Sequence, residues 1–359
     1  MGIENQFVPD FSAPLKPPAP IIADPVNDGD LIAQLARETR ELRAQLASQK
    51  IGAMLVTKDA GSMFHEEPEQ ALIDVSSLDG KELIDQYHAK NAKYATAPFD
   101  PAGDMLRFYP GGVSIWSGFP GAGKTTILRQ FICHTLHRGS SVFLASLEED
   151  PRDVLVRLAS TAAGAEPTAH HMQWFIDAYA KRFRLWGIIG IAQHLRLLAT
   201  VRELAEQGIR HMVIDSLMCL DIRNDDTEAQ RKFANLIATT ARASKVHIHL
   251  VAHPRKLINA DQELDLNDVA GAREIGGIAD NVIFIRRTKA KEGYEQNAEV
   301  TPMCVSVRKQ RHFSGALGDC PGWYQRKFKQ FHKDQFAQMP TRYLPDDAYR
   351  SIKDSRPFT

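Results

Sequence analysis

The stretch Gly118-Phe-Pro-Gly-Ala-Gly-Lys-Thr125 decides the fold. It follows the apolar run Val113–Trp116 and leads into a segment with helical periodicity that extends to His137. A glycine-rich loop between a strand and a helix lets backbone N–H groups surround phosphate oxygens, and the helix N-terminus adds positive potential. The stretch therefore predicts a P-loop, which binds the phosphates of a nucleoside triphosphate such as ATP.

Residue types within this loop have distinct expected roles. The Lys124 ammonium should neutralise the β- and γ-phosphates, and the Thr125 hydroxyl should bind Mg²⁺. The predicted nucleotide-binding residues of the loop are Gly118, Pro120, Gly121, Ala122, Gly123, Lys124, Thr125 and Thr126.

Apolar strands alternate with helices on both sides of this loop. Near-continuous apolar strands separated by helices are typical of an α/β fold with a mostly parallel sheet covered on both faces. Residues 303–328 differ, because they predict antiparallel β-hairpins around Gly315 and Gly318. The expected strands are 113–116, 141–147, 183–188, 211–215, 246–252 and 281–285, and the expected helices are 124–137, 150–163, 193–206 and 227–243.

Carboxylates follow two of these strands. Asp215 ends the strand that begins at His211, at the carboxyl edge where open α/β sheets bind ligands, so it can hold Mg²⁺ together with Thr125. Glu148 and Glu149 follow another strand, and one of them could activate the attacking water. Glu148 is the preferred catalytic base, and the alternative is that both glutamates only favour the N-terminus of the next helix.

A polar cluster follows the strand that starts at Val246. His253 is placed to sense the γ-phosphate and to pass its state to the following loop. Arg255 and Lys256 would lie on that loop and could bind the phosphate backbone of a nucleic acid. The alternative interpretation is a basic turn on the surface.

Composition excludes several classes of protein. Lys+Arg and Asp+Glu are equal at 44 each, so no overall field attracts the chain to nucleic acid. No apolar run approaches the roughly 20 residues that a membrane span needs, and no secretory signal is visible. A cytoplasmic protein without membrane association is therefore expected. Its thiols should be reduced, because no CxxC pair occurs among Cys133, Cys219, Cys304 and Cys320.

Four regions are expected along the chain. Residues 1–28 are proline-rich and predict a disordered arm. Residues 29–95 predict a helical extension and linker, with one helix at about 80–94. The ATPase domain should span 96–333, and residues 334–359 should form a loosely held polar tail.

Six sequence blocks together resemble one family, the RecA-like hexameric replicative DNA helicases of the DnaB class. Within that class the likeness is greatest to Twinkle-type helicases and to the helicase half of short-tailed-phage primase-helicases. The blocks are Gly-Phe-Pro-Gly-Ala-Gly-Lys-Thr-Thr (118–126), Leu-Ala-Ser-Leu-Glu-Glu (144–149), Val-Ile-Asp-Ser-Leu (213–217), Leu-Val-Ala-His-Pro-Arg-Lys (250–256), Gly-Ala-Arg-Glu-Ile-Gly-Gly-Ile-Ala-Asp-Asn-Val-Ile (271–283) and Val-Arg-Lys-Gln-Arg-His-Phe-Ser-Gly (307–315).

The resemblance implies a ring, a hexamer as in other members of this family, with ATP bound between subunits and single-stranded DNA in its channel. Arg287 and Arg311 match the positions from which arginines of a neighbouring subunit complete the site. Family members carry arginine directly before the Phe-x-Gly of the last block, whereas here His312 intervenes. Because a one-residue shift turns a strand side chain to the other face, the resemblance favours Arg287 over Arg311.

The resemblance also implies further partners and an arrangement of the N-terminal helix. No primase region is visible, so any primase or DNA polymerase would be a separate chain. The helix at 80–94, with its apolar residues Leu83, Ile84 and Tyr87, should pack on a neighbouring subunit; the alternative is that it folds back on its own domain.

Two functions remain open from the sequence. The first is an ATP-dependent helicase that moves on single-stranded DNA, 5′ to 3′ as the family resemblance implies, and serves replication, for example of a phage in its host's cytoplasm. The second is a RecA-fold, DNA-dependent ATPase that acts in recombination or as a regulatory switch without unwinding. A non-enzymatic nucleotide-binding module is disfavoured by the full set of Lys124, Glu148, Asp215 and His253.

Overall fold

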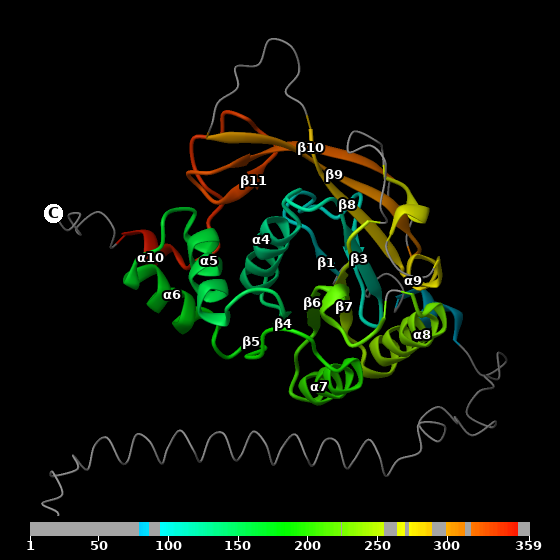
Figure 1. Ribbon diagram of the computed structural model, residues 1–359. Helices are drawn as coiled ribbons and strands as arrows, with labels where there is room; N and C mark the ends of the chain where they lie inside the picture. The colour runs from blue at the N-terminus through cyan, green and yellow to red at the C-terminus, as the bar shows by residue number, and fades with distance from the viewer. Residues whose placement is uncertain are drawn as a thin grey trace, which may run out of the picture. The chain divides into compact units, whose positions relative to one another are not determined.

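The computed structural model describes residues 79–85, 94–223, 225–254, 264–269, 273–288, 299–312 and 317–350. The chain divides into two units, Met1–His65 and Glu66–Thr359, and the described residues all belong to the second. The predicted proline-rich arm therefore lies outside the described residues. Within the second unit, a central sheet lies between helices, as Figure 1 shows.

Parallel strands form the core of this sheet. Their order in the sheet is β8-β3-β7-β6-β4-β5, and each pairs in parallel with its neighbours. These pairings confirm the predicted parallel sheet. The continuous apolar runs in the sequence occur because strands of such a sheet are buried on both faces. The strands are β3 (Val113–Ser117), β4 (Val142–Ser146), β5 (Phe183–Leu185), β6 (His211–Asp215), β7 (His247–Val251) and β8 (Asn281–Arg287).

Antiparallel strands extend the sheet beyond β8, as the sequence predicted for this region. They are β9 (Val300–Gln310), β10 (Gly318–Gln325) and β11 (Gln330–His332). In the pairing of β8 with β9, Met303 lies opposite Arg287 and Gln310 lies opposite Asn281. Strand β9 therefore begins at the carboxyl edge of the parallel strands and ends at their amino edge.

Helices cover both faces of the sheet. Helices α4 (Lys124–His137), α5 (Pro151–Ala163) and α6 (Ala169–Tyr179) contribute to one apolar core, and α7 (His194–Glu206), α8 (Thr227–Ser244) and α9 (Arg273–Ile278) to the other. Among the described helices, none has both the length and the apolar content needed to cross a bilayer. Smaller elements are β1 (Ala95–Thr96), β2 (Arg107–Phe108), η3 (Leu217–Cys219), η4 (Leu266–Asp268) and α10 (Asp346–Arg350).

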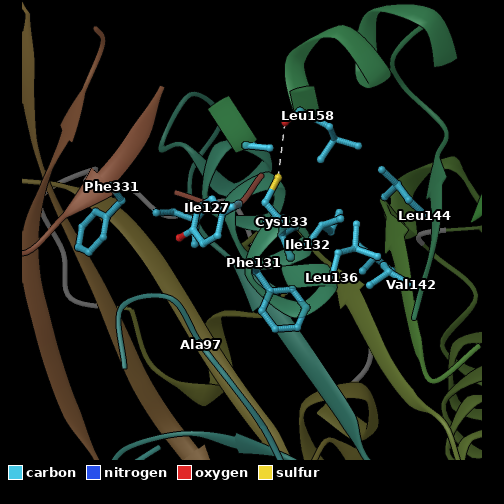
Figure 2. Packing of buried hydrophobic residues seen from close by; sticks show 14 of the residues in the cluster. Ala97, Ile127, Phe131, Ile132, Cys133, Leu136, Val142, Leu144, Leu158 and Phe331 are labelled. Atoms are coloured by element: carbon cyan, nitrogen blue, oxygen red, sulfur yellow. Dashed lines mark hydrogen bonds between the residues drawn. The ribbon is translucent and has the colours of Figure 1, made fainter. Parts of the chain in front are cut away.

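Helix α4 is firmly packed, which matters because its first turn carries Lys124. Figure 2 shows Phe131 and Cys133 of this helix inside a cluster of apolar side chains. The ring of Phe131 is fully buried, and the Cys133 thiol donates a hydrogen bond to the Leu158 carbonyl of α5 at 3.5 Å. Burying side chains of this size contributes about 1.5–3 kcal/mol each, so the end of the P-loop is attached to a rigid element.

Two regions differ from the sequence-based expectation. Helix α6 was not predicted, because its apolar residues are interspersed with histidines and its buried face is narrow. The expectation of a loose tail is wrong around residues 343–348, where Tyr343 and Leu344 are 1% and 2% exposed, whereas residues 334–342 lie on the surface. Tyr343 accepts a 3.2 Å hydrogen bond from Gln130 of α4, so this segment completes the core.

Only part of the predicted helix at 80–94 is described. Residues 80–85 are helical, as expected, whereas residues 86–93 lie outside the described part of the chain. The side chains of Leu83 and Ile84 are 46% and 56% exposed. Packing of this helix on a neighbouring subunit stays a prediction.

Candidate functional site

The P-loop connects β3 to α4 at the carboxyl edge of the parallel strands, and two of its glycines are favoured by close contacts or by a positive φ. A Cβ atom on Gly118 (φ 152°) would clash with the carbonyl oxygen of Ile285 in β8. A Cβ atom on Gly123 (φ 97°) would lie 2.6 Å from Cε of Met303 in β9. The backbone of β8 thus leaves room only for glycine at position 118, whereas at position 123 the positive φ favours glycine and the flexible Met303 side chain could move.

Lys124 lies inside the curve of this loop. Its Nζ donates hydrogen bonds to the carbonyl oxygens of Gly118 and Phe119, at 2.7 and 3.1 Å, and the residue is 8% exposed. Burial lowers the pKa of Lys124, whereas the negative charges of Asp215 and Glu148 raise it. A buried cation beside main-chain groups of a P-loop is suited to neutralising phosphate.

Asp215 and Thr125 meet across the site, as predicted. Thr125 Oγ1 donates a 3.1 Å hydrogen bond to Asp215 Oδ2. Burial, followed by the nearby charge of Glu148, raises the pKa of Asp215 to about 6. A hydroxyl and a carboxylate are the hard oxygen donors that Mg²⁺ prefers, so this pair fits the predicted metal site.

The geometry distinguishes Glu148 from Glu149. Both carboxylate oxygens of Glu149 accept hydrogen bonds from Arg129 at 2.7 Å, and Arg157 lies 3.3 Å away. Glu148 is exposed and accepts a 2.6 Å hydrogen bond from the hydroxyl of Ser216, the residue after Asp215. Glu148 can therefore accept a proton from a water molecule in the site. Glu149 is less suited to this role, because both of its oxygens pair with arginines.

Histidines on and after β7 have different surroundings. His247 and His249 are buried, and burial lowers the pKa of both, so they are neutral members of the core. His253 follows the strand and is partly exposed. Burial and then the positive charge of Lys124 lower the pKa of His253, while Glu148 raises it. These electrostatic effects place His253 near both groups, at the carboxyl edge where the sequence predicted it.

A pocket of about 300 Å³ opens beside the P-loop. Its wall is formed by the P-loop, the end of β8 and the antiparallel strands, and it includes three basic side chains and one aromatic ring. Cations beside a phosphate-binding loop suit a nucleotide, and one of them, Arg287, lies next to the P-loop of its own chain. The lining residues are Gly123, Thr126, Arg287, Thr301, Met303, Tyr324, Arg326 and Lys329.

Arg311 lies at the opposite edge of the sheet. It follows the end of β9, where Gln310 pairs with the first residue of β8. Its guanidinium contacts Asp280 at 3.3 Å and donates to the Gly277 carbonyl at 2.9 Å, and its side chain is 40% exposed. The structure therefore separates the two predicted arginines, with one at each edge of the sheet.

Some site residues could not be found from the sequence. Tyr324, Arg326 and Lys329 reach the P-loop only because β9 and β10 extend the sheet next to β8. Their local sequence carries the alternation of a hairpin but no nucleotide-binding motif. The predicted DNA-binding residues Arg255 and Lys256 lie outside the described residues.

Comparisons with known proteins agree with this arrangement. Residues 102–258 match a protein family described as an AAA domain. The fold is similar to that of a solved ATPase domain, with a TM-score of 0.57 and 17% identity over 71% of this chain and 99% of that one. It is also similar to a DnaB-like replicative helicase whose interactions with primase were studied, with a TM-score of 0.55 and 15% identity over 83% of this chain and 78% of that one. No curated protein matches the sequence.

The predicted resemblance to DnaB-class helicases is thereby confirmed in the fold: the chain carries a RecA-like α/β domain with the architecture of DnaB-like ATPase domains. The match to the AAA domain family covers the P-loop, both glutamates and Asp215. Arg287 and Arg311 lie beyond it.

Proposed function

We propose that this chain, with its DnaB-like ATPase fold, is an ATP-dependent replicative DNA helicase. It forms a ring, hydrolyses ATP with Mg²⁺ between subunits, and translocates 5′ to 3′ on single-stranded DNA. The observation that carries the proposal is the convergence of Lys124, Thr125, Asp215 and Glu148 at one sheet edge, near His253. These groups supply phosphate neutralisation, a metal site, a general base and a phosphate sensor.

The placement of the arginines supports a site shared between subunits. Within a chain, the P-loop lies at the carboxyl edge of the sheet and Arg311 at the amino edge, so Arg311 is directed away from the nucleotide of its own subunit. Head-to-tail association would bring the amino edge of one copy to the carboxyl edge of the next, and repeated contacts of this kind close into rings. Arg311 is therefore our candidate for the arginine that acts on a neighbour's ATP.

Arg287 suits a different role from the one that the sequence favoured. It lines the pocket beside its own P-loop, with Tyr324 on the same wall. An arginine and an aromatic ring can hold a nucleotide base or ribose by stacking and charge. We propose that Arg287 binds the nucleotide of its own subunit.

Kinetics of two arginine variants separate these roles. Arg287→Ala should raise the KM for ATP roughly 10-fold, because it removes an interaction present before and during the reaction. Arg311→Ala should leave nucleotide affinity nearly unchanged and lower kcat roughly 10³-fold or more, because an arginine from a neighbour acts on the transition state. Arg223→Ala, which removes an exposed arginine paired with Asp225, is the control. If Arg287→Ala lowers kcat and leaves KM unchanged, the sequence-based assignment of Arg287 to the neighbour's site is the better one.

DNA binding is proposed through Arg255 and Lys256, which follow His253 in the sequence. A neutral net charge is compatible with this role, because several subunits of a ring multiply a few phosphate contacts by effective concentration. Primase and DNA polymerase would be separate partners. The proposal places the protein in the cytoplasm, where replicating DNA of a bacterium or phage is found.

A forked-DNA assay tests the proposed function. The protein is given ATP, Mg²⁺ and a fork with one fluorescent strand and either a 5′ or a 3′ single-stranded tail. Strand displacement is expected only with the 5′ tail and only with hydrolysable ATP. ATPase activity stimulated by single-stranded DNA, without displacement on either fork, would instead favour the RecA-fold ATPase that acts in recombination or as a switch.

A further inference from the structure

Asp280 has an unusual set of partners at the amino edge of the sheet. The residue lies between α9 and β8 and is only 2% exposed. Its Oδ1 contacts the guanidinium of Arg311 at 3.3 Å and Nε2 of His312 at 3.1 Å. The Tyr109 hydroxyl also hydrogen-bonds to this carboxylate, and burial together with this hydrogen bond raises the pKa of Tyr109. A buried carboxylate with this many donors is held in a single orientation.

The same carboxylate is attached to strand β3. Asp280 Oδ2 accepts a 2.9 Å hydrogen bond from the backbone N–H of Val113, and the backbone N–H of Asp280 donates to the Val113 carbonyl at 2.8 Å. Val113 is the first residue of β3, and Gly118 of the P-loop directly follows the last. Asp280 therefore joins Arg311 to the strand that carries the chain's own P-loop.

The extra residue His312 contributes to this arrangement. Because a carboxylate can only accept a hydrogen bond, His312 must donate from Nε2. Its ring lies 4.0 Å from that of Tyr109, centroid to centroid. Arg311 is thus held on one side by Asp280 and on the other by the Gly277 carbonyl, while 40% of its side chain stays exposed to an approaching molecule.

We propose that Asp280 is a positioning residue for Arg311, the arginine that this chain offers to the nucleotide of a neighbouring copy. Asp280 fixes the direction of that guanidinium and ties it to the first residue of β3. A displacement of the P-loop in one subunit is then passed along β3 to the arginine that acts on the next. This inference rests on the proposed function, in which the site is shared between subunits.

Asp280→Asn is the direct test, because it keeps the size of the side chain and one oxygen that can accept from Val113. The amide cannot also supply a negative charge to Arg311 and His312. We expect kcat of ATP hydrolysis to fall roughly 10- to 100-fold, since misplacing a catalytic group by about 1 Å has effects of that size. The affinity for a fluorescent ATP analogue and the melting temperature should stay close to those of the wild type. Asp319→Asn is a matched control, because Asp319 also pairs with arginines, Arg286 and Arg308, and should leave kcat unchanged.

A double variant distinguishes positioning from a purely structural effect. If Asp280 acts through Arg311, then adding Asp280→Asn to Arg311→Ala should lower the kcat of ATP hydrolysis little or not at all below that of Arg311→Ala alone. If the fold-decrease in kcat of the double variant equals the product of the decreases in the two single variants, the inference is overturned. An Asp280→Asn protein with normal kcat would also overturn it. If Arg311→Ala itself hydrolyses ATP normally, the assignment of Arg311 in the proposed function fails instead.

A mixed-subunit experiment covers the case in which Asp280→Asn lowers the melting temperature. Lys124→Ala subunits, with and without Asp280→Asn, are titrated into wild-type protein at equal total concentration. Neither variant subunit can hydrolyse ATP at its own P-loop. Only the subunit that also carries Asp280→Asn presents a misplaced Arg311 to its neighbour. Stronger inhibition by the double variant, at a temperature where both are folded, supports the inference, and equal inhibition contradicts it.

Discussion

Replacing Lys124 with alanine is expected to abolish ATP hydrolysis and, with it, any strand displacement. The Nζ of Lys124 is the buried cation inside the P-loop, hydrogen-bonded to the Gly118 and Phe119 carbonyls. Alanine removes the charge that would stabilise the β- and γ-phosphates in both the ground state and the transition state. Loss of a single such interaction lowers rates roughly 10²- to 10³-fold, and weaker nucleotide binding adds to it.

The measurement is steady-state release of phosphate over a range of ATP concentrations, with nucleotide binding followed separately. Lys181→Ala, which removes an exposed lysine after α6, should behave as wild type. The far-ultraviolet circular dichroism of Lys124→Ala should match the wild type, since the Lys124 side chain lies within the phosphate-binding loop rather than in the apolar core. Hydrolysis that persists at even a tenth of the wild-type rate would contradict the assigned role of the P-loop.

Replacing Glu148 with glutamine should separate binding from chemistry. The amide keeps the size of the side chain and can still accept the hydrogen bond from Ser216, but it cannot accept a proton from water. General-base catalysis contributes about 10²- to 10⁴-fold, so kcat should fall by that amount while ATP still binds. Single-turnover experiments with preformed protein–ATP complex would measure the chemical step directly.

Glu149→Gln is the matched control, because it makes the same chemical change at the next residue. It removes the charge that pairs with Arg129 and Arg157, which should lower the stability by about 1–3 kcal/mol and leave kcat near that of the wild type. A severe loss of kcat in Glu149→Gln together with a normal Glu148→Gln would reverse the assignment of the base.

The residues of the site could be predicted largely because the motifs lie at strand ends. Parallel strands bring their carboxyl ends to one edge, so a carboxylate after β6 and a histidine after β7 must approach a P-loop that follows β3. Local sequence therefore identified Asp215, Glu148 and His253 without knowledge of the strand order. The sequence favoured Glu148 over Glu149, but the contact that separates them is seen only in the structure, because Glu149 pairs with Arg129, 20 positions away in the sequence.

The positions of the two arginines relative to the P-loop also depend on contacts between segments that are distant in the sequence. Arg287 is the last residue of β8 and Arg311 follows β9. The two strands run in opposite directions, and only their pairing assigns the arginines to opposite edges of the sheet. The sequence shows the apolar alternation of both strands but not their partners. The pocket wall formed by Tyr324 depends on the same pairing.

The packing of residues 343–348 against the core limits how far the protein can be shortened. Tyr343 fills space beside α4, and the side chain of Gln130 also bridges to the backbone of Phe331 at 3.0 and 2.7 Å. A truncation chosen at the last predicted strand would remove this covering and leave the outer side of α4 facing water. The helix that presents Lys124 to the nucleotide therefore relies on a segment more than 200 positions downstream, so a truncation that keeps this helix packed has to retain Tyr343.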